Sequence, residues 1–240
     1  FTISELGQEH YPAWGNLMHS VKTGEIAFDN FFGVDIWKYF EQNPEDGAVF
    51  NNSMTGVTSA INEEIRSLYD FSSFRTVVDI GGGHGALITS ILQANPKVKG
   101  ILFDAPPVIE GARSKIDAAG LADRCETVAG DFFKSVPAGG DAYFMKWIIH
   151  DWNDERANTI LNNIRNQVQP NGKVIIVDAV VPENNEPDFS KFFDLNMMVM
   201  TGGRERTEAE FNKLLAASGF ELKRVIRTTT PVCVIEAVRA

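Results

Sequence analysis

The spacing of hydrophobic residues changes near the end of the first third of the chain. Up to about residue 70, apolar and aromatic side chains recur at helical spacing, interrupted by the turn signal Asn43-Pro44. This pattern predicts several helices. From Arg75 onward, short β-branched runs alternate with helical patterns, which is typical of parallel βαβ units. We therefore expect a helical segment over 1–70 and an α/β domain over 71–240.

Seven runs in the second part predict strands. The first five are expected at 76–80, 98–103, 126–129, 142–147 and 173–178, with helices at 85–94, 106–119 and 153–168 between them. Further helices, at 188–200 and 207–217, precede two extended runs at 221–229 and 232–238. Only Thr230 and Pro231 join these runs, and a parallel crossover needs a dozen or more residues, so they must form an antiparallel hairpin. The sequence predicts a doubly wound, Rossmann-like, seven-stranded, mostly parallel sheet that ends in this hairpin.

Composition narrows the classes of partner. The chain has 240 residues, 44% of them hydrophobic and 22% charged, which is ordinary for a soluble globular protein. Its net charge of −10 and the lack of a basic stripe argue against nucleic acid as a partner. Cys125 and Cys233 form no metal-binding or redox motif, and no apolar stretch approaches a membrane span. We expect a cytoplasmic protein with no structural metal and no membrane partner.

A glycine-rich turn follows the first predicted strand. It holds Gly81, Gly83 and Gly85 directly before a helical run that begins at Ala86. Cofactors of doubly wound sheets bind at such turns, where glycine allows a ligand to approach the backbone closely. A strict dinucleotide fingerprint, G-x-G-x-x-G, would place glycine at Ala86, although alanine is tolerated there. The turn alone leaves open an NAD(P)-type dinucleotide and S-adenosylmethionine.

Three acids at successive strand ends favour S-adenosylmethionine. Asp79, two positions before the first glycine, would repel a pyrophosphate but attract the cationic amino-acid end of that cofactor. Asp104 ends the second strand, where a carboxylate accepts hydrogen bonds from two ribose hydroxyls. Asp131 ends the third strand and offers a carboxylate for the adenine amino group, with Phe132 beside it for the face of the ring.

A candidate base follows the fourth predicted strand. His150 lies at the same edge of the sheet as the glycine-rich turn, and an imidazole can take a proton from a hydroxyl near neutral pH. Asp178, which closes the fifth strand, and Glu205 are the two carboxylates that could orient it. Asp178 could instead be a turn residue. Glu205 could instead be a solvated residue that precedes the helix N-cap Thr207, with Glu210 completing a capping box.

Together these motifs resemble the small-molecule S-adenosylmethionine-dependent O-methyltransferases typified by plant caffeate and flavonoid enzymes, with bacterial relatives on polyketide, phenazine and carotenoid pathways. The likeness extends over the whole chain and rests on five motifs: Val77-Val78-Asp79-Ile80-Gly81-Gly82-Gly83-His84-Gly85, Phe103-Asp104, Gly130-Asp131-Phe132-Phe133, Met145-Lys146-Trp147-Ile148-Ile149-His150-Asp151-Trp152 and Gly202-Gly203-Arg204-Glu205-Arg206-Thr207. The resemblance implies a metal-independent O-methyltransferase. Its methyl group would pass from S-adenosylmethionine by in-line attack to a hydroxyl of a small aromatic or polyketide-like molecule, leaving S-adenosylhomocysteine.

The resemblance also implies roles for individual residues. The residue matching His150 is the general base, flanked by those matching Asp178 and Glu205. The expected cofactor contacts are Asp79, Gly81, Gly83, Asp104, Asp131, Phe132, Lys146, Trp147 and Thr58. The expected acceptor contacts are Trp14, Met18, Phe40, Phe50, Asn51, Met54, Asp151, Met197 and Met198.

The sequence departs from the family pattern in two places. Plant members commonly have Glu where this chain has Asp178, whose side chain is one methylene shorter, so its contact with His150 is an open question. Family members begin with a winged-helix dimerisation domain, and the segment from Phe1 to Gly7 resembles the end of that domain. A homodimer is expected of full-length members.

Three other classes of function fit parts of this pattern. Relatives with the same fold and cofactor have become decarboxylases, hydroxylases or cyclases, and a dinucleotide-dependent oxidoreductase or a catalytically silent binding domain could use a similar sheet. His150, Asp178 and Glu205 together favour methyl transfer. The identity of the acceptor, and whether its reacting atom is oxygen, nitrogen or carbon, lies beyond the sequence.

Overall fold

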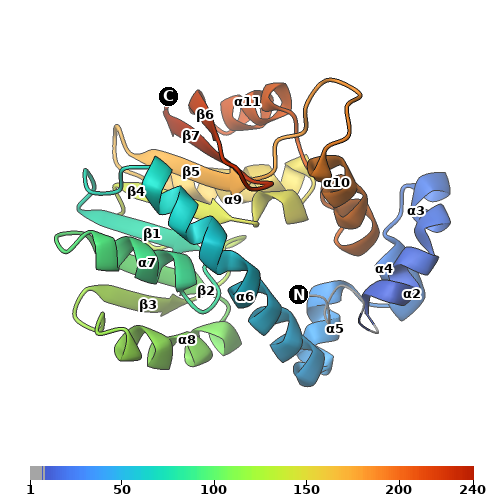
Figure 1. Ribbon diagram of the computed structural model, residues 1–240, viewed down its shortest axis with the longest axis horizontal. Coiled ribbons are helices and arrows are strands. Elements are labelled where there is room, and N and C mark those ends of the chain that lie inside the picture. The colour runs from blue at the N-terminus through green and yellow to red at the C-terminus, as the bar shows by residue number, and fades with distance from the viewer. Residues whose placement is uncertain (1–6, 8) are drawn as a thin grey trace.

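The predicted α/β sheet is present in full. The computed structural model describes residue 7 and residues 9–240, except for the side chains of residues 55–60. Seven strands form one sheet in the order β3-β2-β1-β4-β5-β7-β6 (Figure 1). Their bounds are β1 Thr76–Ile80, β2 Lys99–Asp104, β3 Cys125–Ala129, β4 Ala142–Lys146, β5 Lys173–Asp178, β6 Phe220–Arg227 and β7 Cys233–Arg239.

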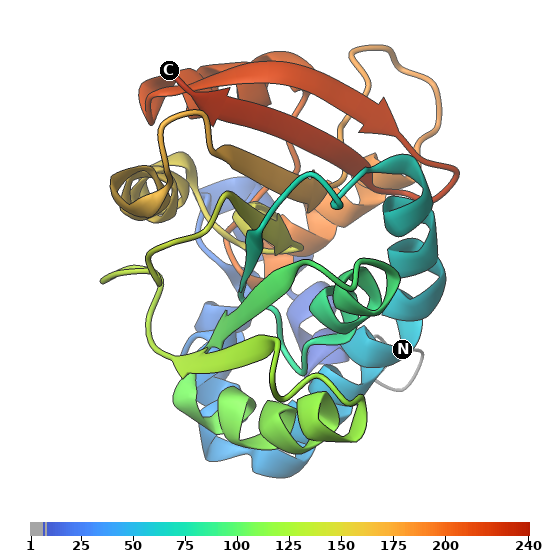
Figure 2. The ribbon, with the colours of Figure 1, turned by 90° about the vertical axis from the view of Figure 1, so that its left-hand side faces the viewer.

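The direction of the strands confirms the predicted topology. The five strands β1 to β5 are mutually parallel, whereas β7 is antiparallel to both β5 and β6. Figure 2 shows the β6–β7 hairpin at one edge of the sheet and β3 at the other. The strand order reverses between the neighbours β1 and β4, and ligands of doubly wound sheets bind at this switch point.

Burial explains why the strands were readable from the sequence. In β1, Val77, Val78 and Ile80 are fully buried, and β4 and β5 likewise read as continuous apolar runs. Parallel strands covered by helices on both faces have this composition. One face is covered by the helices α6 Pro44–Leu68, α7 Ala86–Ala94 and α8 Pro106–Ala118, and the other by α9 Asp154–Gln167 and α11 Glu208–Ala217.

The first part of the chain is helical, as its hydrophobic spacing predicted for the described residues. Its helices before α6 are α2 His10–Gly15, α3 Leu17–Thr23, α4 Ala27–Phe32 and α5 Ile36–Gln42. The predicted turn at Asn43-Pro44 separates α5 from α6, with Pro44 in the first turn of α6, where its missing N–H costs nothing. Within the described parts of the chain, every helix is too short or too polar to span a lipid bilayer.

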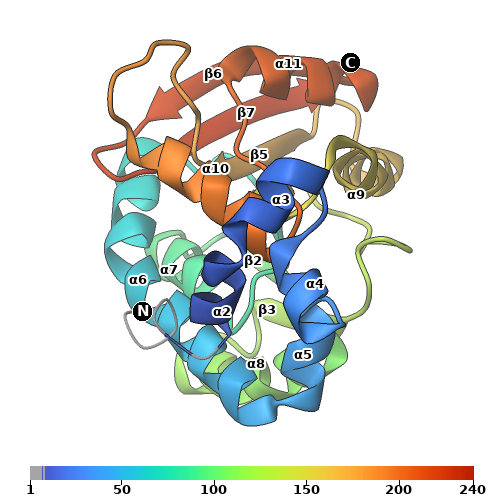
Figure 3. The ribbon, with the colours of Figure 1, turned by 90° about the vertical axis from the view of Figure 1, so that its right-hand side faces the viewer.

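A small core joins these helices to the α/β part. Phe28 on α4 is fully buried together with Val199 and Met200 from α10 Phe189–Met200. Figure 3 shows α2, α3 and α4 beside α10. The ring of Trp37 on α5 contacts the ring of Trp152, which follows β4, with their centroids 6.0 Å apart. The helical segment therefore packs against the carboxyl end of β4.

Candidate active site

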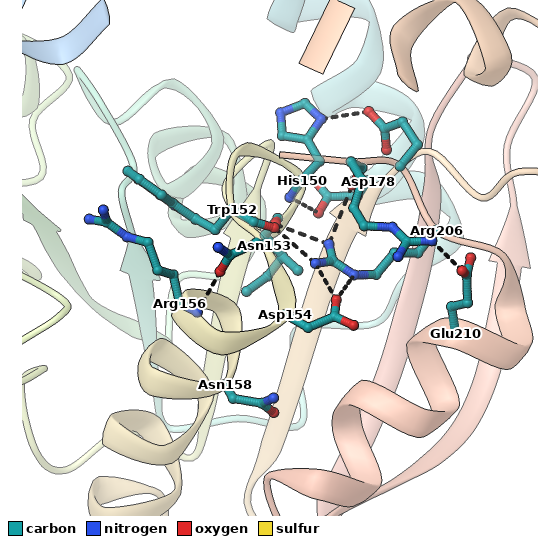
Figure 4. Close-up of polar contacts among 12 residues, drawn as sticks. His150, Trp152, Asn153, Asp154, Arg156, Asn158, Asp178, Arg206 and Glu210 are labelled. Carbon is teal, nitrogen blue, oxygen red and sulfur yellow. Dashed lines mark hydrogen bonds and ion pairs between the residues drawn. The ribbon is translucent and has the colours of Figure 1, made fainter. Parts of the chain in front are cut away.

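The chain leaves β4 through a strained residue. Trp147 has a φ of +55°, a left-handed conformation that costs energy for a bulky side chain. A single 3₁₀ turn, η1 Ile149–Asp151, follows and carries the candidate base. The carboxylate of Asp178 holds this bend by accepting the N–H group of Trp147 at 2.9 Å. It also accepts the N–H group of His150 at 3.2 Å (Figure 4). The strained bend is thus fixed by a buried acid at the end of β5.

Glu205, and not Asp178, contacts the imidazole. Its Oε1 lies 2.7 Å from Nδ1 of His150, and both side chains are almost fully buried. The sequence left both carboxylates as candidates, and the structure separates their roles because Asp178 reaches only the backbone of His150. The other ring nitrogen, Nε2, has the carboxylate of Asp151 3.8 Å away.

Three buried carboxylates surround one imidazole, and their charges shift its pKa. Burial alone would lower the pKa of His150, but the negative charges of Glu205, Asp151 and Asp178 outweigh it and raise the pKa to about 10. Burial raises the pKa of Asp151 to about 6, against the opposing charge of His150. Burial also raises the pKa of Asp178. The raised pKa favours the protonated form of His150 in the protein without ligands.

The segment that carries Glu205 packs directly on the turn that carries His150. A Cβ on Gly203 would lie 2.0 Å from the carbonyl oxygen of His150, so only glycine fits there. The next N–H group, of Arg204, donates to the same carbonyl at 2.8 Å. The N–H of Glu205 donates to Asp194 on α10 at 2.9 Å. These backbone contacts fix the height of Glu205 relative to the imidazole.

Arg206 is the largest fully buried side chain of the described residues, and sequence reasoning gave it no role. Its guanidinium donates to the carbonyls of Ile149 at 3.2 Å, Trp152 at 2.9 Å and Arg204 at 3.3 Å. It also donates twice to Oδ1 of Asp154, at 3.0 and 2.8 Å (Figure 4). The only sequence signal for this role was a cation directly beside Glu205.

The glycine-rich turn has the geometry of a cofactor cradle. Gly81, Gly83 and Gly85 all have positive φ, between +59° and +79°. Gly85 is also the N-cap of α7, as the predicted turn-to-helix junction requires. A Cβ on Gly83 would meet nothing within 4 Å, so the backbone there is open to a ligand. Ile148 fills the space beside Gly81, which brings the turn next to the His150 segment.

Asp79 lies beneath this turn. It is 2% exposed, and no hydrogen-bond partner of its Oδ2 is found in the described part of the chain. Burial raises the pKa of Asp79 to about 8, while the nearby charge of Lys146 opposes the shift. A buried carboxylate oxygen in need of a donor fits the ammonium group of an amino-acid ligand.

Asp104 and Asp131 differ in the hydrogen bonds that their carboxylates accept from the nearby backbone. The carboxylate of Asp104 accepts the N–H of Gly83 and the N–H of Ala105, both at 2.7 Å, and so ties the end of β2 to the glycine turn. Asp131 is exposed and accepts the N–H of Phe133 at 2.9 Å. Both acids retain acceptor capacity, since a carboxylate has about four lone-pair sites.

An aromatic cluster next to Asp131 includes a residue that the sequence reasoning did not select. Phe132, Phe133 and Trp152 form mutual edge contacts with centroid distances of 4.8 to 6.2 Å. Arg156 stacks on both Phe133 and Trp152. Trp147, expected near the adenine, packs against the core on the α7 side of the sheet, whereas Phe132 and Trp152 pack on the α9 side. The run His150-Asp151-Trp152 was the available signal for Trp152.

The predicted acceptor residues fall into three groups. Trp14 stacks on Phe192 and donates to Asn196 on α10 at 2.9 Å, and Phe40 stacks on Phe50 at 4.9 Å. Met18 is 55% exposed on α3, so it is not among the enclosed side chains. The remaining described members are buried or half-buried: Asn51, Met54, Asp151, Met197 and Met198. The side chain of Thr58 lies outside the described residues.

Comparison with known proteins matches this geometry to one family. A fold of this topology, with a glycine-rich turn and acids at the switch point, defines a Rossmann-like methyltransferase, and solved neighbours contain S-adenosylmethionine or S-adenosylhomocysteine. The family model described as an O-methyltransferase domain matches residues 14–221. The chain therefore belongs to the S-adenosylmethionine-dependent O-methyltransferases.

Several named relatives carry the same assignment. The phenazine O-methyltransferase PhzM of Lysobacter antibioticus is 46% identical over 96% of this chain and 68% of its own length. The mitomycin biosynthesis 6-O-methyltransferase of Streptomyces lavendulae is 39% identical over 96% of this chain and 66% of its own. The solved structure of LaPhzM matches with a TM-score of 0.95 and 44% identity, over 99% of this chain and 71% of that chain. The chain spans about two thirds of the length of these relatives.

Proposed function

We propose that this chain transfers the methyl group of S-adenosylmethionine to a hydroxyl of a small aromatic or polyketide-like acceptor, with His150 as the general base. The observation that carries the proposal is the buried contact between Nδ1 of His150 and Glu205, 2.7 Å long, beside the glycine-rich turn. A carboxylate bound to one ring nitrogen orients the imidazole and increases the basicity of the other nitrogen.

His150 would act through Nε2. When bound, S-adenosylmethionine supplies an electrophilic methyl group on a positively charged sulfur. A positive charge close to the imidazole lowers its pKa from the raised value of about 10, and so favours the neutral form that can accept a proton. The acceptor hydroxyl would give its proton to Nε2 as its oxygen takes the methyl group in line, with the methyl–sulfur bond breaking to leave S-adenosylhomocysteine. Glu205 would stabilise the imidazolium that forms.

Residues around the glycine-rich turn would hold the cofactor. We assign the amino-acid end to Asp79, the backbone of Gly81 and the open backbone of Gly83, and the ribose to Asp104. The orphaned Oδ2 of Asp79 and the open side of Gly83 support this assignment. Asp131, Phe132, Lys146 and Thr58 complete the proposed set, and the cluster of Phe132 with Trp152 favours Trp152 over Trp147 as the aromatic partner of the adenine.

The helical segment over 1–70 would supply one wall of the acceptor pocket, and the domain over 71–240 would bind the cofactor. Phe40 and Phe50 stack on each other within this segment, and Trp14 stacks on Phe192 of α10. The same helix contributes Met197 and Met198. A pocket with this lining suits a flat, apolar acceptor. One neighbour, NcsB1, was solved with 2-hydroxy-5-methyl naphthoic acid, and hydroxylated phenazines and naphthoates are therefore the first acceptors to test.

The test is methyl transfer by a His150→Ala variant. With labelled S-adenosylmethionine and a panel of hydroxylated phenazines and naphthoates, we expect the variant to bind S-adenosylhomocysteine normally and to lose at least 100-fold in turnover. The matched control is His19→Ala, which changes another histidine. His19 lies on α3 and is paired with Glu25. A His150→Ala variant that binds both ligands and keeps the natural turnover would refute the proposed role.

The same assay separates the alternative functions. A fold relative solved as a dimethyltransferase of an amino-riboflavin, RosA, shows that this architecture also serves nitrogen acceptors, so amino analogues belong in the panel. Consumption of an acceptor without label transfer would favour decarboxylation, hydroxylation or cyclisation. Calorimetry with S-adenosylhomocysteine and NADH distinguishes the cofactor class, because a dinucleotide enzyme would bind only the second.

A further inference from the structure

We propose that Arg206 is a positioning residue that locks the turn carrying His150 to the segment carrying Glu205, and so sets the contact between the two side chains. The proposal rests on the proposed function of His150. It concerns a side chain that touches neither the imidazole nor the open backbone of the glycine-rich turn.

The guanidinium of Arg206 uses every donor it has. An arginine side chain carries five N–H groups, and Arg206 makes five hydrogen bonds, three to backbone carbonyls and two to Asp154. Its side chain is 1% exposed, whereas that of Asp154 is 58% exposed. The buried end of the interaction is therefore the set of three carbonyls, and Asp154 closes the site toward solvent.

The three carbonyls lie on both sides of the catalytic contact. Ile149 and Trp152 bracket the turn that contains His150 and Asp151, and the carbonyl of Arg204 directly precedes Glu205. One rigid, planar group thus spans two segments that are more than fifty residues apart in the sequence. Because the fork of the guanidinium has fixed geometry, it determines the separation of these segments as well as binding them.

The backbone contacts that the described residues make between these segments restrain them less than the guanidinium does. The N–H of Arg204 to the carbonyl of His150 joins the two segments at one point, and the N–H of Val181 to the carbonyl of Arg206 joins the segment to the chain beyond β5. The single hydrogen bond of Arg204 would let the two segments rotate about it. The three hydrogen bonds from the planar guanidinium of Arg206 to the carbonyls prevent that rotation. Misplacement of a catalytic group by about 1 Å can cost about 100-fold in rate.

Arg206 also carries a charge, and the charge and the geometry have opposite effects on His150. Titratable and charged groups face the imidazole from η1, β5 and the Glu205 segment, namely Asp151, Asp178 and Glu205. Removing a nearby cation would leave these acids less compensated, and would raise the pKa of His150. Loosening the contact with Glu205 would remove the strongest of these opposing charges, and would lower it. The direction of the shift therefore reports which effect Arg206 exerts.

The experiment measures the pKa of His150 by NMR of ¹⁵N-histidine-labelled full chain, in the natural protein and in Arg206→Met. The His150 signals are assigned by their loss in His150→Ala. We expect the pKa of His150 to fall by at least one unit in Arg206→Met, and kcat to fall about 100-fold while the KM for the cofactor stays within threefold. Arg206→Lys keeps the charge without the fork, and we expect it to lower the pKa as well.

The matched control is Arg124→Met. Arg124 is a half-buried arginine that donates to the carbonyls of Leu92, Asn95 and Val98 at the end of α7, away from His150. We expect it to lose stability without moving the pKa of His150. If Arg206→Met folds, an unchanged or raised pKa of His150 in that variant would overturn the proposal. If it does not fold, an unchanged pKa of His150 in Arg206→Lys would overturn it. The titration needs no turnover, so it stays valid even if His150→Ala shows that His150 is not the base.

Discussion

The replacement of Glu205 by Gln isolates the charge that acts on the imidazole. Gln keeps the size of the side chain and an oxygen that can accept the N–H of Nδ1, but it removes the negative charge 2.7 Å from that nitrogen. Both side chains are buried, so the interaction is weakly screened by salt. With the charge centres about 4 Å apart and an effective dielectric constant of about 20, the lost interaction is worth about 4 kcal/mol.

This magnitude gives two expected results. At about 1.36 kcal/mol per pKa unit, the pKa of His150 falls by about three units, so the acidic limb of the pH–rate profile moves about three pH units lower than in the natural enzyme. If between half and all of this interaction energy between Glu205 and His150 stabilises the transition state, kcat on the plateau of the pH profile falls by about 30- to 1000-fold. The variant is thus a base over a wider pH range, but a weaker one.

The assay is kcat and kcat/KM for methyl transfer between pH 5 and 10 at saturating S-adenosylmethionine. Glu208→Gln, at an exposed position in the first turn of α11, is the control for removing one carboxylate from this region. An acidic limb that stays in place or moves upward would contradict the reasoning. So would a plateau kcat within threefold of the natural value.

Three further predictions concern the cofactor turn, the backbone and metal dependence. Because the pKa of Asp79 is raised to about 8 and its ionised form would bind the cofactor ammonium, S-adenosylhomocysteine should bind more tightly as the pH rises from 6 to 8, with net proton release in calorimetry that Asp79→Asn abolishes. In urea unfolding, Gly203→Ala should lose about 1–3 kcal/mol of unfolding free energy, and it should lose most of its activity, because the new Cβ would meet the carbonyl of His150. Gly15→Ala is the control, since its Cβ would meet nothing within 4 Å, and it should not be destabilised. Activity should survive exhaustive chelation, because a protein base takes the hydroxyl proton; loss restored by Mg²⁺ would contradict this.

The sheet could be predicted almost residue by residue because its strands are buried runs between clear turn signals. β1 and β5 begin and end at the predicted residues, and the hairpin followed from the two-residue link at Thr230-Pro231. The predicted fourth strand extended one residue too far. Trp147 adopts a left-handed conformation there, and no propensity anticipates a bulky residue in that region.

The candidate site was harder to predict because its key distances depend on tertiary packing. The sequence supplied His150 with two candidate carboxylates, and tertiary contacts such as the packing of Gly203 on the His150 carbonyl decide that Glu205 reaches the ring. Asp178 follows the fifth strand as expected, yet it acts on backbone N–H groups. The only signal for Arg206 was its place beside Glu205, because arginine is usually exposed and three of its five hydrogen bonds go to backbone carbonyls, which any sequence provides.

The most direct test of the central claim is a crystal structure of this chain with S-adenosylhomocysteine and the acceptor that it turns over fastest. If His150 is the base, the reacting oxygen lies within hydrogen-bond distance, about 3 Å, of Nε2 of His150, with the cofactor sulfur in line behind the position of the transferred methyl group. Glu205 then remains on Nδ1. An acceptor whose reacting oxygen faces away from Nε2, with another side chain of the protein in hydrogen-bond contact with it, would contradict the assignment of His150 as the base.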